Sequence, residues 1–149
     1  MATFKLDIIT PQREAFSDEV DAIYVPTKNG IIGVLPHHIG LFTALTEGEI
    51  KIFFKGKEWF MAIGGGFMEV TKKSVSILVS RAVHADELNE AEIKKAYASA
   101  KDVIADKGKG QERADAQTIL RRSILELKVL KRREHHRSMP FPSSTTQSN

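Results

Sequence analysis

Two pairs of adjacent histidines are the side chains in this 149-residue sequence that come nearest to a set of metal ligands: His37 with His38, and His135 with His136. Neighbouring residues on a strand point to opposite faces, and neighbours on a helix lie about 100° apart, so neither pair can readily chelate one ion. The sequence contains no cysteine, which excludes disulfides and thiolate sites. We therefore expect no metal site.

Serine, histidine and aspartate are all present, but no nucleophile elbow or other spaced catalytic constellation accompanies them. The enzyme hypothesis that remains is a general base at the corner formed by Pro36, His37 and His38, and it predicts turnover by the isolated chain. The residues favour a protein with no catalytic group of its own.

A run of three glycines, Gly64 to Gly66, invites a phosphate-binding interpretation because glycine-rich loops cradle phosphates with backbone N–H groups. The required context is missing, since no Gly-Lys-Ser/Thr follows the run and no helix is expected to open after it. We interpret the run as a bulge or a close strand crossing, and expect no cofactor.

Short segments with apolar side chains at every second position predict β-strands. They cover residues 4–8, 20–25, 31–35, 50–54, 59–63, 67–70 and 75–79, and a further strand is expected after the corner at Pro36, His37 and His38. The polar stretch 12–19 is expected to be a connection. Evenly spaced strands with turn signals between them indicate an antiparallel sandwich or flattened barrel.

The segment that organises these strands begins with the Asn29-Gly30 dipeptide. Both residues accept the positive φ of a two-residue type I′ turn, so we predict such a turn here. Pro36 cannot donate to a strand ladder, and it should end the following strand at an edge or corner.

Two helices are predicted after Asp86. Asn89 can cap the first, with Glu92 three residues on, and a glycine-rich connection should fold the second, residues 111–137, back antiparallel. The apolar stripe of the first helix contains Ile93, Ala96, Tyr97, Ala100, Val103 and Ile104; that of the second contains Ala116, Leu120, Ile124, Leu127 and Leu130.

These elements define a mostly β plus α fold, in which an N-terminal antiparallel β-sandwich is followed by a C-terminal antiparallel two-helix hairpin. The expected boundaries are 1–86 for the sandwich, 87–137 for the hairpin and 138–149 for a disordered tail, which has no periodicity. No run approaches the roughly 18 to 20 apolar residues of a membrane span, and the N-terminus lacks the features of a signal peptide.

The positive charge of the chain is concentrated at its C-terminal end. From Arg121 onward there are seven Lys and Arg residues against two acids, in a chain whose net charge is +3. A solvated helix face is the plainest interpretation, and a helix that grips nucleic acid or an anionic membrane is an alternative, although no aromatic side chains are interleaved.

The stretch from Gly30 to Leu45 has the pattern Gly-x-x-Gly-x-Leu-Pro-His-His-x-x-Leu-x-Thr-x-Leu, and a Gly-Gly-Phe-x-x-Val segment begins at Gly65. Both resemble hallmarks of the epsilon subunit of F-type ATP synthases. The chain departs from the family pattern at two positions, with His37 where glycine is usual and Gly40 where proline is usual.

The resemblance implies a non-catalytic subunit of the central rotor stalk that couples proton flow to ATP synthesis. Its implied partners are the gamma subunit and the c-ring, with no nucleic acid, and it would be peripheral at the cytoplasmic face of the bacterial plasma membrane, meeting the membrane only through the complex. The corresponding rotor-interface residues, expected at one end of the sandwich, are Lys28, Asn29, Gly30, Ile31, Pro36 and His38.

In this family the hairpin either packs on the sandwich or extends along gamma, where its basic side meets the beta subunit, and alpha beside it. The resemblance therefore implies that the hairpin restrains ATP hydrolysis. The residues expected to do so are Arg121, Arg122, Lys128, Lys131 and Arg132.

Some bacterial epsilon subunits bind ATP through Ile/Leu-Asp-x-x-Arg-Ala at the start of the first helix and arginines of the second. Here the first motif reads from Leu88 to Ile93, with Asn89 for the aspartate and Glu92 for the arginine. Arg122 matches one second-helix arginine, but Glu126 replaces the other. We therefore expect no high-affinity nucleotide site.

Overall fold

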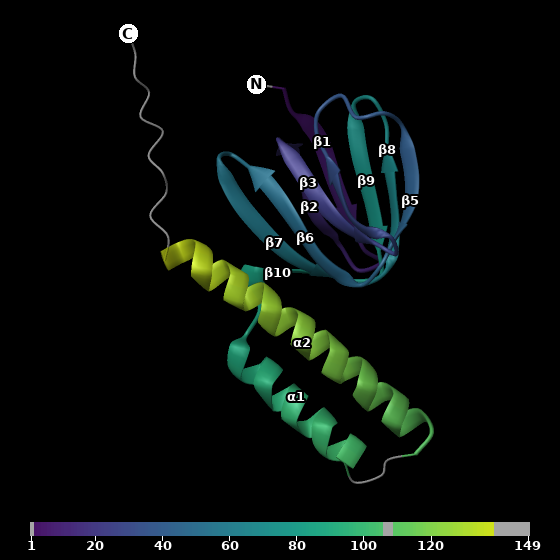
Figure 1. The fold of residues 1–149 in the computed structure, drawn as a ribbon, viewed down its shortest axis with the longest axis vertical. Helices are drawn as coiled ribbons and strands as arrows, with labels where there is room; N and C mark the ends of the chain where they lie inside the picture. Colours follow the sequence, from purple (N-terminus) through teal and green to yellow (C-terminus); the bar gives the residue numbers. More distant parts are fainter. Residues whose placement is uncertain (1, 106–108, 139–149) are drawn as a thin grey trace.

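The computed structural model describes residues 2–105 and 109–138, with side chains described up to Arg133 in the last helix. These residues form two five-stranded sheets packed face to face, followed by a helical hairpin at one end (Figure 1). The predicted fold class, an antiparallel sandwich followed by a two-helix hairpin, is confirmed.

The first sheet contains the first strand of the chain, and the second sheet contacts the helical hairpin. The first sheet has the order β2 (Glu14–Val20), β1 (Phe4–Ile9), β9 (Ser74–Val79), β8 (Gly66–Val70), β5 (Leu41–Leu45). The second has the order β10 (Ala82–His84), β7 (Lys57–Ile63), β6 (Gly48–Phe54), β3 (Ala22–Thr27), β4 (Gly30–Val34). Neighbouring strands are antiparallel except β1 and β9, which pair in parallel.

The core lies between the two sheets and follows the alternation read from the sequence. Side chains at every second position of a strand face inward, and the apolar ones there lose essentially all contact with water. Fully buried members include Leu6, Ile8, Ile23, Ile50, Ile52, Met61, Ile63, Met68 and Ile77.

Two strands were not predicted. Residues 12–19, expected to be a connection, contain most of β2, an edge strand whose outward positions carry Glu14, Ser17 and Glu19 and which therefore lacks an apolar alternation. The three-residue strand β10 was missed because it is too short to show a period.

The predicted type I′ turn at Asn29 and Gly30 is wrong. Thr27 pairs with Gly30, so the two loop residues are Lys28 and Asn29, and only Gly30 has a positive φ, 114°. The Thr27 hydroxyl closes the loop, donating to the Gly30 carbonyl at 2.7 Å and accepting from the Asn29 N–H at 3.3 Å. A side chain therefore stabilises this loop, where two left-handed residues were expected.

A turn with two positive φ values joins β6 to β7. Phe54 pairs with Lys57, and the residues between them, Lys55 and Gly56, have φ values of 51° and 75°. Adjacent left-handed residues match the right-handed twist of the flanking strands, as in a type I′ hairpin. This turn sets the register of the hairpin on which the second helix rests.

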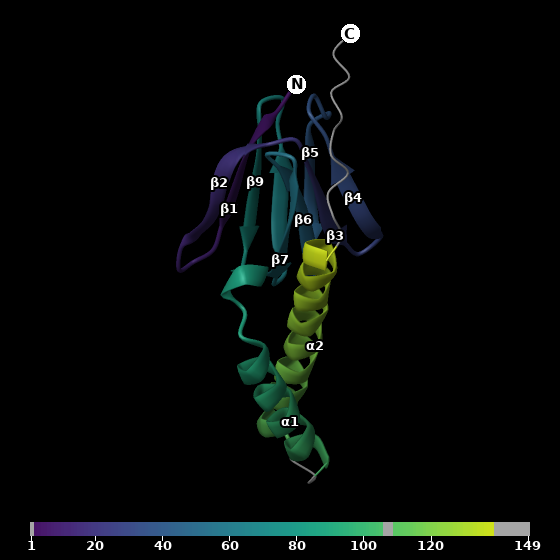
Figure 2. The same cartoon turned by 90° about the vertical axis from the view of Figure 1, so that its left-hand side faces the viewer.

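After β10 the chain forms a short 3₁₀ helix, η1 (Ala85–Glu87), and then α1 (Glu90–Ala105) and α2 (Gln111–Ser138). The predicted cap is confirmed, because the Asn89 side-chain oxygen accepts from the N–H groups of Ala91 and Glu92 at 3.0 and 3.3 Å. Figures 1 and 2 show α2 along one end of the sandwich and α1 beyond it. Residues 139–149 of the predicted tail lie outside the described residues.

The single apolar stripe predicted for α2 is wrong at Ile124, which is 53% exposed. The helix is buried on two sides, since α1 packs on one and the sandwich on the other. The buried positions consequently include Ser123, Glu126 and Val129, which fall outside the predicted stripe. Within residues 2–105 and 109–138, no helix is both long enough and apolar enough to cross a membrane.

Candidate interaction surfaces

The predicted rotor-interface residues lie at the two ends of β4. Lys28, Asn29 and Gly30 form the turn that enters this strand, whereas Pro36 and His38 follow its other end, where Val34 pairs with Ile23. The expectation that all six residues gather at one end of the sandwich is therefore wrong. Pairing between β3 and β4 places the turn and the corner a strand length apart.

Each of these two groups has its own exposed apolar side chain. Ile31, next to the turn, is 75% exposed. The corner after β4 presents Leu35 and Ile39 to solvent, and His38 is tied to it by its N–H, which donates to the Leu35 carbonyl at 3.2 Å. The two groups are thus separate exposed surfaces.

A row of exposed apolar side chains crosses the outer face of the first sheet. Ile9 is opposite Leu78 in the β1–β9 pair, and Leu78 is opposite Phe67 in the β8–β9 pair. The Phe67 ring stacks on Phe42 of the edge strand, with centroids 5.6 Å apart. We call Ile9, Phe42, Phe67 and Leu78 the outer apolar row; each is at least 40% exposed.

The sequence carried a signal for this row that was not used. Phe67 and Leu78 each adjoin an inward apolar residue, so an apolar side chain occupies the outward position where solvent would favour a polar one. Contiguous apolar side chains on one exposed face mark an interaction site more often than scattered ones do.

α2 covers part of the outer face of the second sheet, at β7. Phe60 and Ala62, at outward positions of β7, pack with Val129 of α2 and Ala85 of η1, and Leu88 and Leu125 border the cluster. Phe60 is 3% exposed and Val129 is fully buried. The hairpin therefore docks on the sandwich through an apolar contact.

The five predicted regulatory residues lie on α2 beside this contact, and each of them is exposed. The Nε of Arg121 is 2.8 Å from the Glu47 carboxylate, and the Nε of Arg132 is 3.8 Å from that of Glu49. Burial raises the pKa of the Glu49 carboxyl, while the charges of Arg132, Lys128 and Lys51 act in the opposite direction. Part of the basic side thus meets acids of the sandwich.

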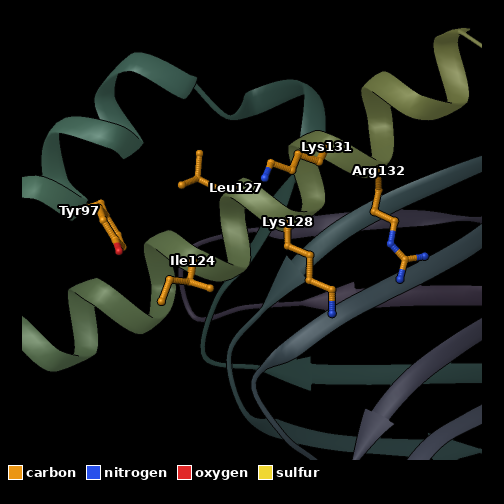
Figure 3. Close-up of a pocket in the computed structure, with 6 residues that line it drawn as sticks. All are labelled: Tyr97, Ile124, Leu127, Lys128, Lys131 and Arg132. Atoms are coloured by element: carbon orange, nitrogen blue, oxygen red, sulfur yellow. The ribbon is translucent and has the colours of Figure 1, made fainter.

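Between α1 and this basic side lies a hollow of about 710 Å³, drawn in Figure 3. Tyr97 enters it from α1, whereas Lys128 and Arg132 extend from α2 toward the sheet. Its lining consists of Tyr97, Ile124, Leu127, Lys128, Lys131 and Arg132. The hollow combines an apolar floor with positive charge.

Two arginines hold the segment that joins the sandwich to the hairpin. Arg13 makes a forked contact with the Glu87 carboxylate at 2.6 and 2.8 Å and also donates to the Ala82 carbonyl. Its hydrogen bond lowers the pKa of Glu87. From α2, Arg133 donates to the Ala85 carbonyl at 3.1 Å and to Asp86 at 3.0 Å.

His84, at the start of this joining segment, predicts a pH dependence. Its ring stands edge-on to Trp59, with centroids 5.3 Å apart, and burial lowers its pKa despite the charges of Glu87 and Asp86. The unfolded chain therefore takes up the proton more readily. We expect stability to fall as pH decreases through the ordinary histidine range, near 6.5, and to level off below the pKa of the folded ring.

The measurement is the urea midpoint of unfolding between pH 7.5 and 5, compared with a His84→Phe variant that keeps an aromatic ring against Trp59. The urea midpoint of the variant should depend less on pH, because the contribution of His84 is removed. An identical slope in both proteins would show that this ring does not carry the effect.

The metal-ligand and glycine-loop interpretations concern side-chain clusters and the Gly64–Gly66 run. Among residues 2–105 and 109–133, no three potential ligand side chains gather as a metal site would require. The Gly64–Gly66 run lies where strands approach closely: a Cβ on Gly66 would stand 2.0 Å from the Leu78 carbonyl oxygen. The close approach of strands expected for this run is confirmed, and it lies between β8 and its paired neighbour β9.

Comparison with known proteins assigns the fold to a family. Residues 3–85 match the family described as the β-sandwich domain of the ATP synthase delta/epsilon chain. The chain is 39% identical over 137 residues to the ATP synthase epsilon chain of Dehalococcoides mccartyi, covering 91% of this chain and 98% of that one. It is 40% identical over 124 residues to that of Chloroflexus aggregans, covering 83% and 89%.

Solved structures show the same fold at lower identity. A chain of the Euglena gracilis mitochondrial ATP synthase OSCP/F1/c-ring structure matches with a TM-score of 0.63 and 22% identity, covering 91% of this chain and 81% of that one. A chain of the Tetrahymena thermophila central stalk/c-ring structure matches with 0.54 and 16%, covering 87% and 97%. The sequence comparisons establish that this chain belongs to the family of ATP synthase epsilon chains, which are subunits of a complex and not enzymes by themselves.

Proposed function

We propose that this chain is the epsilon subunit of the central rotor stalk of an F-type ATP synthase, where it helps to couple proton flow to ATP synthesis. The observation that carries the proposal is the outer apolar row on a chain of this family, because such a row calls for a covering partner. The two solved relatives come from F1/c-ring and central stalk/c-ring assemblies, which agrees with a place in the stalk.

The gamma subunit is the partner we assign to the outer apolar row. Three of its side chains, Ile9, Leu78 and Phe67, are neighbours across adjacent strands, and Phe42 extends the row to the sheet edge. The face is on the side of the sandwich away from the hairpin contact, which is on the second sheet. Gamma can therefore bind while the hairpin stays docked.

We assign the two exposed groups at the ends of β4 to the rotor, one to the c-ring and the other to gamma. The turn with Lys28, Asn29 and Gly30 carries the exposed Ile31, and the corner with Pro36 and His38 carries Leu35 and Ile39. Because these groups are a strand length apart, one of them can meet the c-ring while the other meets gamma. The chain would then be peripheral at the cytoplasmic face of a bacterial plasma membrane, held there by the complex.

The assignment of gamma is tested by placing charge on the outer apolar row. A Phe67→Lys, Leu78→Lys variant should bind gamma about a thousandfold more weakly, because two apolar anchors at an interface commonly contribute about 2 kcal/mol each. Binding of the purified chain to gamma is the measurement. Ile124→Lys is the matched control, since Ile124 is also exposed and apolar but lies on α2. Equal losses in both variants would refute the assignment of gamma to this face.

We also propose that the hairpin restrains ATP hydrolysis through the basic side of α2, by contact with beta and alpha. Arg121, Arg122, Lys128, Lys131 and Arg132 are all exposed, as such a contact requires. Exposed ion pairs contribute about 0 to 1 kcal/mol each, so the effect would come from several together.

Residues 1–86 are proposed to be an independent folding unit. Deleting residues 87–149 should leave a sandwich that unfolds cooperatively, because its core lies between the sheets. The deletion uncovers Phe60 and Ala62, however, so the fragment should self-associate.

Calorimetry and sedimentation measure the two effects. Phe60→Thr should reduce self-association of the fragment and destabilise the full chain by about 2 kcal/mol or more, since only the full chain buries this ring under α2. A fragment without a cooperative transition would show that the sandwich depends on the hairpin.

A further inference from the structure

A charged pair lies inside the apolar contact between the sandwich and α2. Arg81, in the connection between β9 and β10, donates from Nη2 to the Glu126 carboxylate of α2. The side chains of Arg81 and Glu126 are 28% and 9% exposed. On α2, Glu126 lies between Leu125, which borders the Phe60 cluster, and the fully buried Val129.

This pair differs from the two ion pairs that α2 makes with Glu47 and Glu49 of the sandwich. In the Arg121–Glu47 and Arg132–Glu49 pairs the arginine side chains are 65% and 47% exposed, so water and salt screen them. Burial lowers the pKa of Arg81, and the nearby charge of Arg122 adds to this effect while Glu47 opposes it. The Glu126 carboxylate therefore neutralises a cation that has lost part of its hydration.

A partly buried ion pair does two things that an apolar contact does not. It sets the register, because a helix shifted by one turn would leave Glu126 buried without its cation. It also makes separation less unfavourable, because both charges regain water when the surfaces part, which offsets part of the apolar area exposed. The contact is thus specific when closed and able to open.

We propose that Arg81 and Glu126 form a latch that sets how α2 docks on the sandwich and lets the hairpin leave it reversibly. Glu126 thus belongs to the sandwich-facing side of α2 and not to its basic side. Opening the latch uncovers Leu125 and Val129 and frees Arg121 and Arg132 from Glu47 and Glu49. The regulation of ATP hydrolysis by this opening rests on the proposed function. The latch itself does not depend on the proposed function.

The latch is tested by measuring docking in the full-length chain. The sequence has no cysteine, so Lys72→Cys on the sandwich and Gln117→Cys on α2, both exposed, give two unique spin-label positions. Pulsed electron paramagnetic resonance measures the distances between the two labels, and the distance distribution gives the ratio of undocked to docked hairpin. Arg81→Met and Glu126→Gln should each raise this ratio about tenfold or more. The first leaves the buried Glu126 carboxylate without its cation, and the second leaves the Arg81 cation without a neutralising charge.

Charge exchange separates a latch from a merely structural contact. Arg81→Glu with Glu126→Arg should restore most of the docked population, and Arg81→Met with Glu126→Leu should dock at least as fully as the unchanged chain. Glu90→Gln, which removes the exposed Glu90–Lys94 pair within α1, is the control and should change nothing. Unchanged docking in the single variants, or no recovery on charge exchange, would overturn the proposal.

The effect of the hairpin on ATP hydrolysis is measured separately, as the ATPase rate of the reconstituted ATP synthase head. If the single variants undock the hairpin in the isolated chain but leave the ATPase rate unchanged, the latch stands and the proposed restraint of hydrolysis fails. If docking itself does not respond, the latch fails whatever the ATPase rate.

Discussion

Replacing Gly66 with alanine is expected to destabilise this chain by more than about 3 kcal/mol, the largest loss we predict for a single substitution. A Cβ at this position would lie 2.0 Å from the Leu78 carbonyl oxygen and 2.7 Å from the Val79 Cα. Both atoms belong to the backbone of β9, which is held in the middle of the first sheet. The strand would have to move, and the core beneath it with it.

The neighbouring Gly65 supplies the matched control. A Cβ there would meet its nearest atom, the Leu45 carbonyl oxygen, at 3.4 Å, an ordinary contact, so Gly65→Ala should cost less than about 1 kcal/mol. Chemical denaturation of the two variants measures the difference. Equal losses would mean that the backbones of β8 and β9 do not approach as closely at Gly66 as described.

The second large effect concerns ATP hydrolysis. In a reconstituted ATP synthase head, removing residues 87–149, or changing Arg121, Arg122, Lys128, Lys131 and Arg132 together to alanine, should raise the hydrolysis rate several-fold. Five exposed pairs at about 0 to 1 kcal/mol each add up to the few kcal/mol that bias a two-state element, whereas a single Arg122→Ala change should do little.

The control for the five-residue variant is loss of charge on the other helix. Lys94, Lys95 and Lys101 are exposed on α1, and changing them to alanine removes positive charge without touching α2. Because Arg121 and Arg132 also contact Glu47 and Glu49, docking of each variant is measured with the same spin labels. Equal hydrolysis rates with the unchanged, five-residue and truncated chains would show that the hairpin is no restraint.

Much of the fold could be predicted because its signals are local. The alternation of apolar and polar residues predicted the strands that carry the core, and the N-cap at Asn89 predicted the start of α1. The errors have non-local causes. The edge strand β2 has mostly polar outward positions, and the loop at Lys28 and Asn29 is closed by the Thr27 hydroxyl. Neither feature follows from apolar periodicity.

The candidate surfaces were harder to predict, since they depend on which elements become neighbours. The sequence places Glu126 among the basic residues of α2, and it does not reveal that α2 is buried on two sides. Leu78 and Phe67 become one surface only when β8 and β9 pair in the observed register. The turn at Asn29 and the corner at Pro36 are close in sequence, yet β4 separates them.

The central claim, that this chain is a stalk subunit, is tested most directly by finding it in the assembled enzyme. The ATP synthase is purified from membranes of the host and its structure is determined. We predict that the chain stays with the complex when membranes are washed with salt, leaves with the soluble head, and presents Phe67 and Leu78 to the gamma subunit. Release by salt alone, as a free-standing module bound to nucleic acid or anionic membrane would show, or absence from the purified enzyme, would contradict the account.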